Sequence, residues 1–98
     1  MRVTVPHNTT KEAAKKKLQA LADQLLREHG HRIEDVDQQW QGDQLLVSMK
    51  ARGFNVKGMV EVTDSDVIVD GKLPLIAKPF ESKIKSTIEK EGQKIFSA

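Results

Sequence analysis

The sequence contains no cysteine, which excludes a disulfide framework and thiol chemistry and is compatible with a reducing compartment. No apolar run approaches the roughly 18 residues that a membrane-spanning helix needs, and the first residues lack a signal-peptide core. Neither sign of charge dominates, because 16 Lys and Arg stand against 14 Asp and Glu. We therefore expect a soluble protein whose 98 residues form one domain, 1–98.

The sequence also lacks the motifs of common catalytic and cofactor sites. It has neither a glycine-rich dinucleotide pattern nor a P-loop, and no serine lies in a nucleophile elbow. His29 and His31 are not joined by carboxylates at a metal-ligand spacing, and a local structural hydrogen bond is favoured for His7. The carboxylates fall at turn and surface positions rather than in a shielded site. The sequence therefore predicts no enzyme, no cofactor and no metal site.

Nucleic-acid binding is not favoured by the pattern of charges. Lys50, Lys57 and Lys72 fall on the polar face of the predicted sheet, but acidic residues stand among them and no exposed aromatic residue accompanies them. The pattern is more typical of a solvated face.

What the sequence does have is a run of four predicted antiparallel strands between residues 36 and 73. Gly42-Asp43 suits a type II′ hairpin turn, because glycine accepts a positive φ. Arg52-Gly53 can form a second two-residue loop, and the polar stretch 63–66 a third turn. These turns predict the cross-strand pairs Gln41–Gln44, Trp40–Leu45, Ala51–Phe54, Met49–Val56 and Val62–Val67.

The three turns give one consistent inner face, because side chains alternate along a strand. The inward residues form three rows: Trp40, Leu45, Val60 and Val69; Gln38, Val47, Gly58 and Gly71; Val36, Met49, Val56 and Leu73. Gly58 and Gly71 are neighbours, and we expect Phe80 or Ile84 to fill the dent that they leave. Gln38 either lines a ligand cavity or lies at an open sheet edge with its amide bonded or hydrated.

A small apolar cluster is predicted on the outer, largely polar face of the sheet. Leu46 lies opposite Met59 there, with Ile68 nearby. These three residues are the candidate interaction surface, against the alternative of scattered surface apolar side chains.

Two amphipathic helices flank the strands. After a short strand at 2–5, Thr9 and Glu12 fit a capping box, and a helix is predicted from about Thr10 to His29, with Gly30 as the C′ residue that stops it. Its apolar stripe is Ala14, Leu18, Leu21, Ala22, Leu25 and Leu26, and its solvent side carries Lys11, Lys15, Lys16 and Lys17. A second helical segment spans 75–96, with Pro79 at its start or at a kink.

The element order is therefore β-α-β-β-β-β-α. It predicts an α+β two-layer sandwich, in which an antiparallel sheet of four to five strands carries both helices on one face. The first strand lies either at the edge beside the last strand or parallel to the second strand after a right-handed crossover.

Several short motifs resemble a family of small bacterial proteins, the polyhydroxyalkanoic acid system family. They are Pro6-His7 ahead of a helix with Glu12-Ala13, Trp40-x-Gly42-Asp43, the stretch from Gly53 to Gly58, and Leu73-Pro74-Leu75 followed by Phe80 and Ile84. The resemblance covers nearly the whole chain. It implies a cytoplasmic protein with a role at polyhydroxyalkanoate granules, and it implies no catalytic residues.

We therefore expect a non-enzymatic accessory protein that contacts the polyester granule surface or granule proteins. The alternative is a small-molecule or nucleic-acid binding module. A cavity lined by Gln38, Gly58 and Gly71 would favour ligand binding, whereas a filled core would favour an interaction protein. The oligomeric state does not follow from the sequence.

Overall fold

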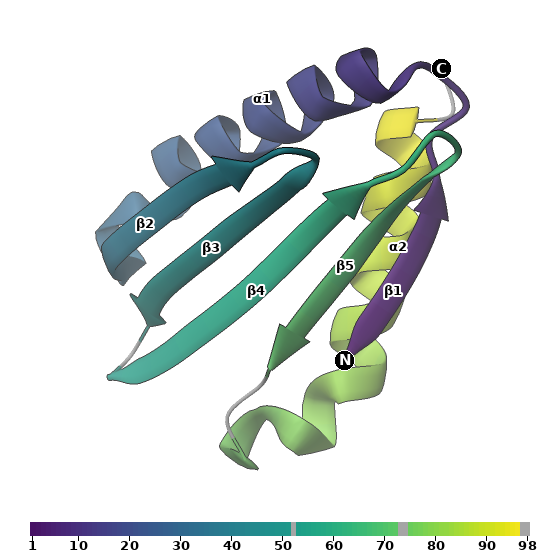
Figure 1. The fold of residues 1–98 in the computed structure, drawn as a ribbon. Coiled ribbons are helices and arrows are strands. Elements are labelled where there is room, and N and C mark those ends of the chain that lie inside the picture. Colours follow the sequence, from purple (N-terminus) through teal and green to yellow (C-terminus); the bar gives the residue numbers. More distant parts are fainter. Residues whose placement is uncertain (52, 73–74, 97–98) are drawn as a thin grey trace.

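The computed structural model describes the backbone of residues 1–51, 53–72 and 75–96, and their side chains except those of residues 29 and 76. The chain is an α+β structure with the predicted order of elements (Figure 1). In chain order the elements are β1 (Arg2–Pro6), α1 (Lys11–His29), the 3-10 turn η1 (Gly30–Arg32), β2 (Ile33–Gln41), β3 (Gln44–Ala51), β4 (Phe54–Val62), β5 (Asp66–Lys72), the 3-10 segment η2 (Leu75–Phe80) and α2 (Glu81–Phe96).

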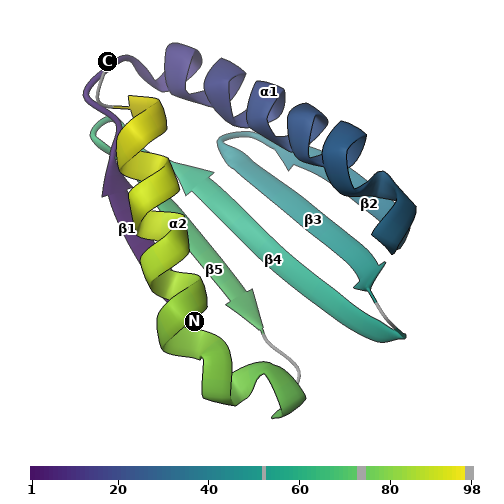
Figure 2. The same ribbon diagram turned by 180° about the vertical axis from the view of Figure 1, so that it is seen from behind.

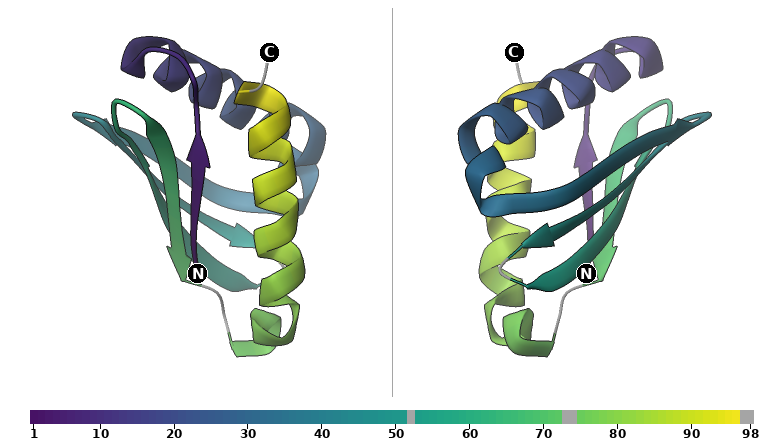
Figure 3. Two further views of the ribbon diagram at one scale, coloured as in Figure 1. Left: turned by 90° about the vertical axis from the view of Figure 1, so that its right-hand side faces the viewer. Right: turned by 90° about the vertical axis from the view of Figure 1, so that its left-hand side faces the viewer.

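The five strands form one antiparallel sheet in the order β1-β5-β4-β3-β2. The first strand therefore takes the edge position beside the last strand, and β2 is the opposite edge. Both helices lie on the same side of this twisted sheet (Figure 3). This arrangement confirms the predicted two-layer α+β sandwich.

The register of the hairpins is the predicted one. Gly42 has a φ of +61° and Gly53 a φ of +82°, as tight two-residue loops require of their glycines. The observed pairs include Gln41–Gln44, Trp40–Leu45, Ala51–Phe54, Met49–Val56, Val62–Val67 and Gly58–Gly71. The helix-covered face is thus built from the rows that the sequence predicts.

One row differs at the start of β2. The pairing of β2 with β3 shifts between Glu34 and Asp37, and Asp35 has a φ of 53°, so the strand contains a bulge there. Val36 consequently lies in the irregular part of the strand rather than in a regular pair with Met49. Aspartate tolerates the left-handed region better than most residues, which is why it can occupy the bulge. Leu73, predicted for the same row, lies outside the described residues.

The predicted capping box at Thr9 is wrong by one residue. Thr10 is the N-cap of α1, and its Oγ1 accepts a hydrogen bond from the backbone N–H of Ala13 at 3.1 Å. The N–H of Thr9 instead donates to Nδ1 of His7 at 3.1 Å, so it is not left for Glu12. Gly30 ends α1 as expected but as the C-cap in the right-handed region, with a φ of −57°, because the chain continues directly into η1.

The buried core occupies one corner of the molecule. One buried cluster joins β1, both helices and the β4–β5 hairpin, and its members are Val3, Val5, Ala14, Leu18, Val62, Val67 and Phe96. Each fully buried aliphatic side chain stabilises the fold by about 1.5–3 kcal/mol. The corner where the N-terminus of α1 meets the C-terminus of α2 therefore anchors both helices to the sheet.

The prediction that Phe80 or Ile84 fills the dent in the sheet is wrong. Phe80 is 61% exposed. A Cβ built on Gly58 would contact only the Asp70 carbonyl oxygen, at 3.6 Å, and one on Gly71 only the Lys57 carbonyl oxygen, at 3.7 Å. These contacts come from the sheet itself, because α2 lies over β1 at the sheet edge and not over the centre (Figure 2).

Gly92 explains the position of α2. A Cβ at residue 92 would lie 2.9 Å from Cγ2 of Val5, closer than real side chains approach. The glycine therefore lets α2 lie directly on β1, and the helix continues past it to Phe96. With α2 held at one edge of the sheet, the centre of the sheet is left to α1 alone.

Candidate functional site

An apolar groove of about 370 Å³ lies between α1 and the inner face of the sheet. We call it the α1 groove. Its helical wall is the C-terminal part of the predicted stripe, namely Leu18, Leu21, Ala22, Leu25 and Leu26. Its opposite wall comes from β2 and β3 and consists of Ile33, Val36, Gln38, Val47 and Met49. Leu45 and Val60 complete the lining at the end next to the core.

The groove exists because the two helices diverge from the corner at which they are anchored (Figure 2). Leu18 and Leu45 are buried at that end, whereas Leu25, two turns further along α1, is 46% exposed. Phe54 begins β4 on the same face of the sheet, since it alternates with Val56, and it is 42% exposed. The apolar face is thus covered at one end and open to solvent at the other.

A chain of side-chain hydrogen bonds joins the edge strand β2 to α1. Nε1 of Trp40 donates to Oε1 of Gln19 at 2.8 Å. Nε2 of Gln19 donates to Oε1 of Gln38 at 3.2 Å and to Oδ1 of Asp23 at 3.0 Å. Both alternatives for Gln38 therefore apply in part: it lies on the edge strand with its amide bonded, and it also lines the groove. Gly58 and Gly71, expected beside it in a cavity, are not among the lining residues.

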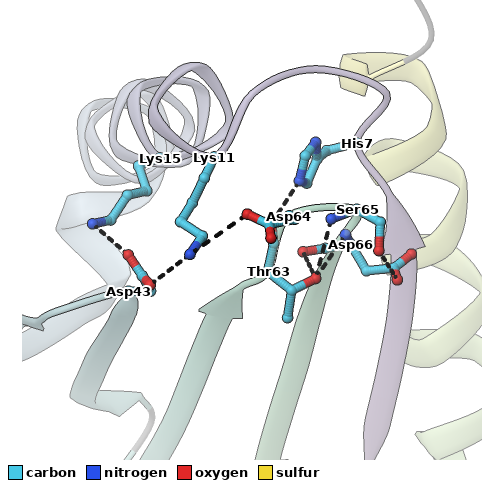
Figure 4. A network of polar contacts seen from close by, with 8 residues as sticks. All are labelled: His7, Lys11, Lys15, Asp43, Thr63, Asp64, Ser65 and Asp66. Atoms are coloured by element: carbon cyan, nitrogen blue, oxygen red, sulfur yellow. Dashed lines mark hydrogen bonds and ion pairs between the residues drawn. The ribbon is translucent and has the colours of Figure 1, made fainter.

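The closed end of the groove is fixed by two lysines of α1 on the β2–β3 turn (Figure 4). Nζ of Lys11 and Nζ of Lys15 each lie 3.0 Å from a carboxylate oxygen of Asp43. The hydrogen bond from Lys15, followed by that from Lys11, lowers the pKa of the Asp43 carboxyl below its usual range. The hydrogen bond to Asp43 raises the pKa of Lys11.

These contacts correct the prediction that the lysines simply cover the solvent side of α1. Lys11 and Lys15 bind the sheet turn, and Nζ of Lys15 also lies 5.3 Å from the centre of the Trp40 ring. Nζ of Lys17 donates to the backbone oxygen of Ile95 at 3.2 Å, which ties α1 to α2. Lys16 is exposed, as predicted.

His7 is the one polar side chain that is buried among the described residues, with 1% exposed. Its Nδ1 accepts from the N–H of Thr9, so Nε2 carries the proton and donates to the Thr63 carbonyl at 2.8 Å. Its backbone N–H also donates to the Ser65 carbonyl at 3.1 Å. His7 therefore holds the β1–α1 connection against the β4–β5 turn (Figure 4), which confirms the predicted structural hydrogen bond.

The predicted outer-face cluster is placed as follows. Leu46 of β3 pairs with Met59 of β4. Ile68 of β5 pairs with Glu61 and is therefore the diagonal neighbour of Met59. All three apolar side chains are half-buried, on the face without helices. Their role as an interaction surface stays a prediction.

The other described histidine, His31, and the carboxylates do not gather into one site. His31 accepts a hydrogen bond from Nε of Arg32 at 3.2 Å in η1, and the side chain of His29 lies outside the described residues. Within the described residues, no group of three or more His, Asp or Glu side chains is placed to hold a metal ion. Nor does any helix in the same residues have the length and apolar character to cross a membrane.

The sequence pattern alone does not predict a site at the groove residues Leu21, Leu25 and Val47. The sequence does contain one signal: the helix offers more apolar side chains than the core can bury. The apolar stripe of α1 runs on to Leu26, beyond the part that the core buries, and the sheet row of Gln38 and Val47 lacks side chains at Gly58 and Gly71. That imbalance was interpreted as a socket for α2, because the position of α2 could not be deduced from its own sequence.

The fold and groove define a two-layer α+β protein in which an open antiparallel sheet has a half-covered apolar face. A family model described as "Putative polyhydroxyalkanoic acid system protein" matches residues 1–96. The chain belongs to this family, as the sequence motifs predicted. No curated protein and no solved structure matches the chain.

Proposed function

We propose that this protein is a non-enzymatic accessory protein of the polyhydroxyalkanoic acid system. It associates in the cytoplasm with polyhydroxyalkanoate granules and makes the contact with the apolar part of its helix-covered face. Membership of the family supports the assignment to this system. The observation that carries the proposal is the half-covered apolar face along the α1 groove, with Leu25 and Phe54 exposed at its open end.

The energetics of the open face favour such a contact. Isolated apolar side chains on a surface are ordinary, but an apolar groove flanked by further exposed apolar side chains is typical of an interaction site. Leu25 and Phe54 are such side chains, with 46% and 42% exposed. Leu75 and Phe80, by contrast, belong to η2, which contacts α2, and neither of them lines the groove. Covering apolar surface gains about 25 cal/mol for each Å² removed from water, and a polyester surface rich in alkyl groups can supply that cover.

The outer-face cluster is the weaker candidate for the contact. Leu46, Met59 and Ile68 are each half-buried by their neighbours in the sheet, and the hollows that Leu46 and Met59 help to line are shared with charged residues such as Lys57. Charged side chains such as Glu61 and Asp70 stand between them. A flat, mixed surface of this kind gains less from contact with an apolar granule than the α1 groove does.

The experiment that tests the proposal is fractionation of polyester-producing cells. We expect the full chain to sediment with the granules and to appear in the supernatant of matched cells that make no polyester. A chain that stays in the supernatant while granules are present would overturn the proposed function.

A further inference from the structure

We propose that the α1 groove is a binding site for one neutral aliphatic chain carrying an ester carbonyl, and that Gln38 donates a hydrogen bond to that carbonyl oxygen. The choice of an ester rests on the proposed function, since a polyhydroxyalkanoate is a polyester with alkyl substituents. The binding site itself is inferred from the shape, charge and hydrogen bonding of the groove.

The shape and lining of the groove suit an alkyl chain. Its volume of about 370 Å³ is at the small end of the range for ligand pockets, about 300–1,000 Å³. The walls are aliphatic, with Leu21 and Leu25 on the helix and Val47 and Met49 on the sheet, and no lining residue in the described part of the chain is aromatic. Such walls offer no stacking surface for a planar ring, whereas each methylene placed between them gains about fourfold in affinity.

The charge of the groove selects a neutral ligand. Among the residues that the structure describes, none that lines the groove carries a charge. The two lysines of α1 at the closed end are engaged with the sheet turn, since Nζ of Lys11 and Nζ of Lys15 each lie 3.0 Å from a carboxylate oxygen of Asp43. A carboxylate drawn into the groove would lose its hydration without gaining a partner, which is costly.

The hydrogen bonds around Gln38 fix which end of its amide is free. An indole N–H can only donate, so Trp40 requires the oxygen of Gln19 to face it, at 2.8 Å. The nitrogen of Gln19 then faces Gln38, whose oxygen accepts at 3.2 Å. The Gln38 nitrogen is therefore turned away from Gln19, and within the described residues it donates no hydrogen bond to the protein.

This leaves two N–H donors on the single polar side chain that lines the groove. A carbonyl oxygen of a bound chain satisfies one of them, whereas a pure hydrocarbon leaves both unmatched and costs affinity. Gln38 lies midway between the closed end at Leu45 and the open end at Leu25. An alkyl segment can thus extend from the carbonyl in both directions, as it does in an ester with alkyl groups on both sides.

The test uses two soluble probes that differ only at the carbonyl. Methyl octanoate carries the ester, and methyl octyl ether replaces its carbonyl by a methylene. Each is titrated into the isotope-labelled full chain, and the shifts of the Gln38 side-chain amide and of the Leu21 and Val47 methyl groups are followed by NMR. Octanoate, which carries a charge at neutral pH, is the third probe. The variants are Gln38→Leu and its control Gln39→Leu, an exposed residue on the other face.

We expect the wild-type chain to bind methyl octanoate about 5- to 10-fold more tightly than the ether, the effect of one hydrogen bond. Gln38→Leu should lose this preference and still bind both probes, Gln39→Leu should keep it, and octanoate should bind more weakly than the ester. Equal affinity for ester and ether in the wild type, tighter binding of octanoate, or no shift of the groove methyl groups would each overturn the proposal.

Three further outcomes are distinguishable. A concentration-dependent dimer that Leu21→Arg abolishes would assign the groove to a second copy of the chain and overturn the ester site. A chain that sediments with granules but binds no ester would remove this inference and leave the proposed function standing. Ester binding without granule association would overturn the proposed function and leave the ester site standing.

Discussion

Replacing Gly92 by alanine tests how closely α2 lies on β1. An alanine Cβ would stand 2.9 Å from Cγ2 and 3.1 Å from Cγ1 of Val5. Val5 is only 3% exposed, and its β-branched side chain has little freedom to rotate away. Overpacking of this kind costs about 1–3 kcal/mol, against about 1 kcal/mol that alanine gains over glycine inside a helix.

The two effects together give a net loss of about 0–2 kcal/mol, and because the buried Val5 has little freedom to move, we expect Gly92→Ala to lower the free energy of unfolding by about 1–2 kcal/mol. The melting temperature should fall by about 4–15 °C in a chain of this size, measured by circular dichroism at the helix signal. Ser86→Ala, at an exposed position of α2, is the matched control for helix propensity and should be neutral or slightly stabilising.

The double variant Val5→Ala/Gly92→Ala identifies the cause of the loss. Removing the two methyl groups of Val5 makes room for the new Cβ, so the two changes should be less destabilising together than the sum of the single changes. If Gly92→Ala is as stable as the wild type, or if the two effects simply add, then α2 does not lie against Val5 and the account of its position is wrong.

Three further predictions concern the sheet and its connections. Gly58→Val should change the free energy of unfolding by no more than about 0.5 kcal/mol, because a Cβ there meets only a backbone oxygen in ordinary contact at 3.6 Å. A loss of several kcal/mol in a thermal melt would mean that a helix side chain does fill the dent. His7→Leu should cost about 2–4 kcal/mol, because it leaves the Thr63 carbonyl and the Thr9 N–H without their partner, and a chemical denaturation curve that matches the wild type would refute the structural role of His7. Asp43→Asn should lower the melting temperature at neutral pH and lose this effect as the pH falls below about 4. The reason is that the pKa of the Asp43 carboxyl is lower in the folded chain than in the unfolded chain. The stabilisation from Asp43 is therefore present above the unfolded pKa and is lost as the pH falls through the folded pKa. A difference between Asp43→Asn and wild type that is the same at pH 3 and pH 7 would contradict this.

The register of the sheet could be deduced from the sequence because the decisive signals are local. Gly42 and Gly53 identify two loops, and strict alternation then fixes every pair in the hairpins, since a slip of one residue would expose the whole inner row. The bulge at Asp35 could not be deduced in this way. It breaks the alternation at a position where no glycine marks it.

The start of α1 shows a second kind of limit. Thr9 and Thr10 are adjacent, and both are good N-caps by residue type. The choice between them depends on Nδ1 of His7, which occupies the N–H of Thr9. That bond depends in turn on the Thr63 carbonyl, which is far away in the sequence.

The α1 groove depends on long-range packing and therefore could not be predicted from the sequence. The apolar residues of α1 and of the sheet were correctly assigned to facing surfaces. Whether Phe80 or solvent lies between them depends on where α2 is anchored, which is decided by the contact of Gly92 with Val5. Neither residue carries a local signal for that contact, so a socket for α2 and an open groove were equally consistent with the same pattern.

The most direct test of the central claim is sedimentation of the purified chain with washed polyhydroxyalkanoate granules, using two matched double variants. Leu25→Ser/Phe54→Ser changes the open end of the α1 groove, and Leu46→Ser/Met59→Ser changes the outer face to the same extent. All four positions are at least partly exposed, so both variants should remain folded, which circular dichroism checks. We predict that the groove variant loses most of its binding to granules and that the outer-face variant sediments like the wild type. Loss of binding in the outer-face variant, with binding retained in the groove variant, would contradict the assignment of the contact to the helix-covered face.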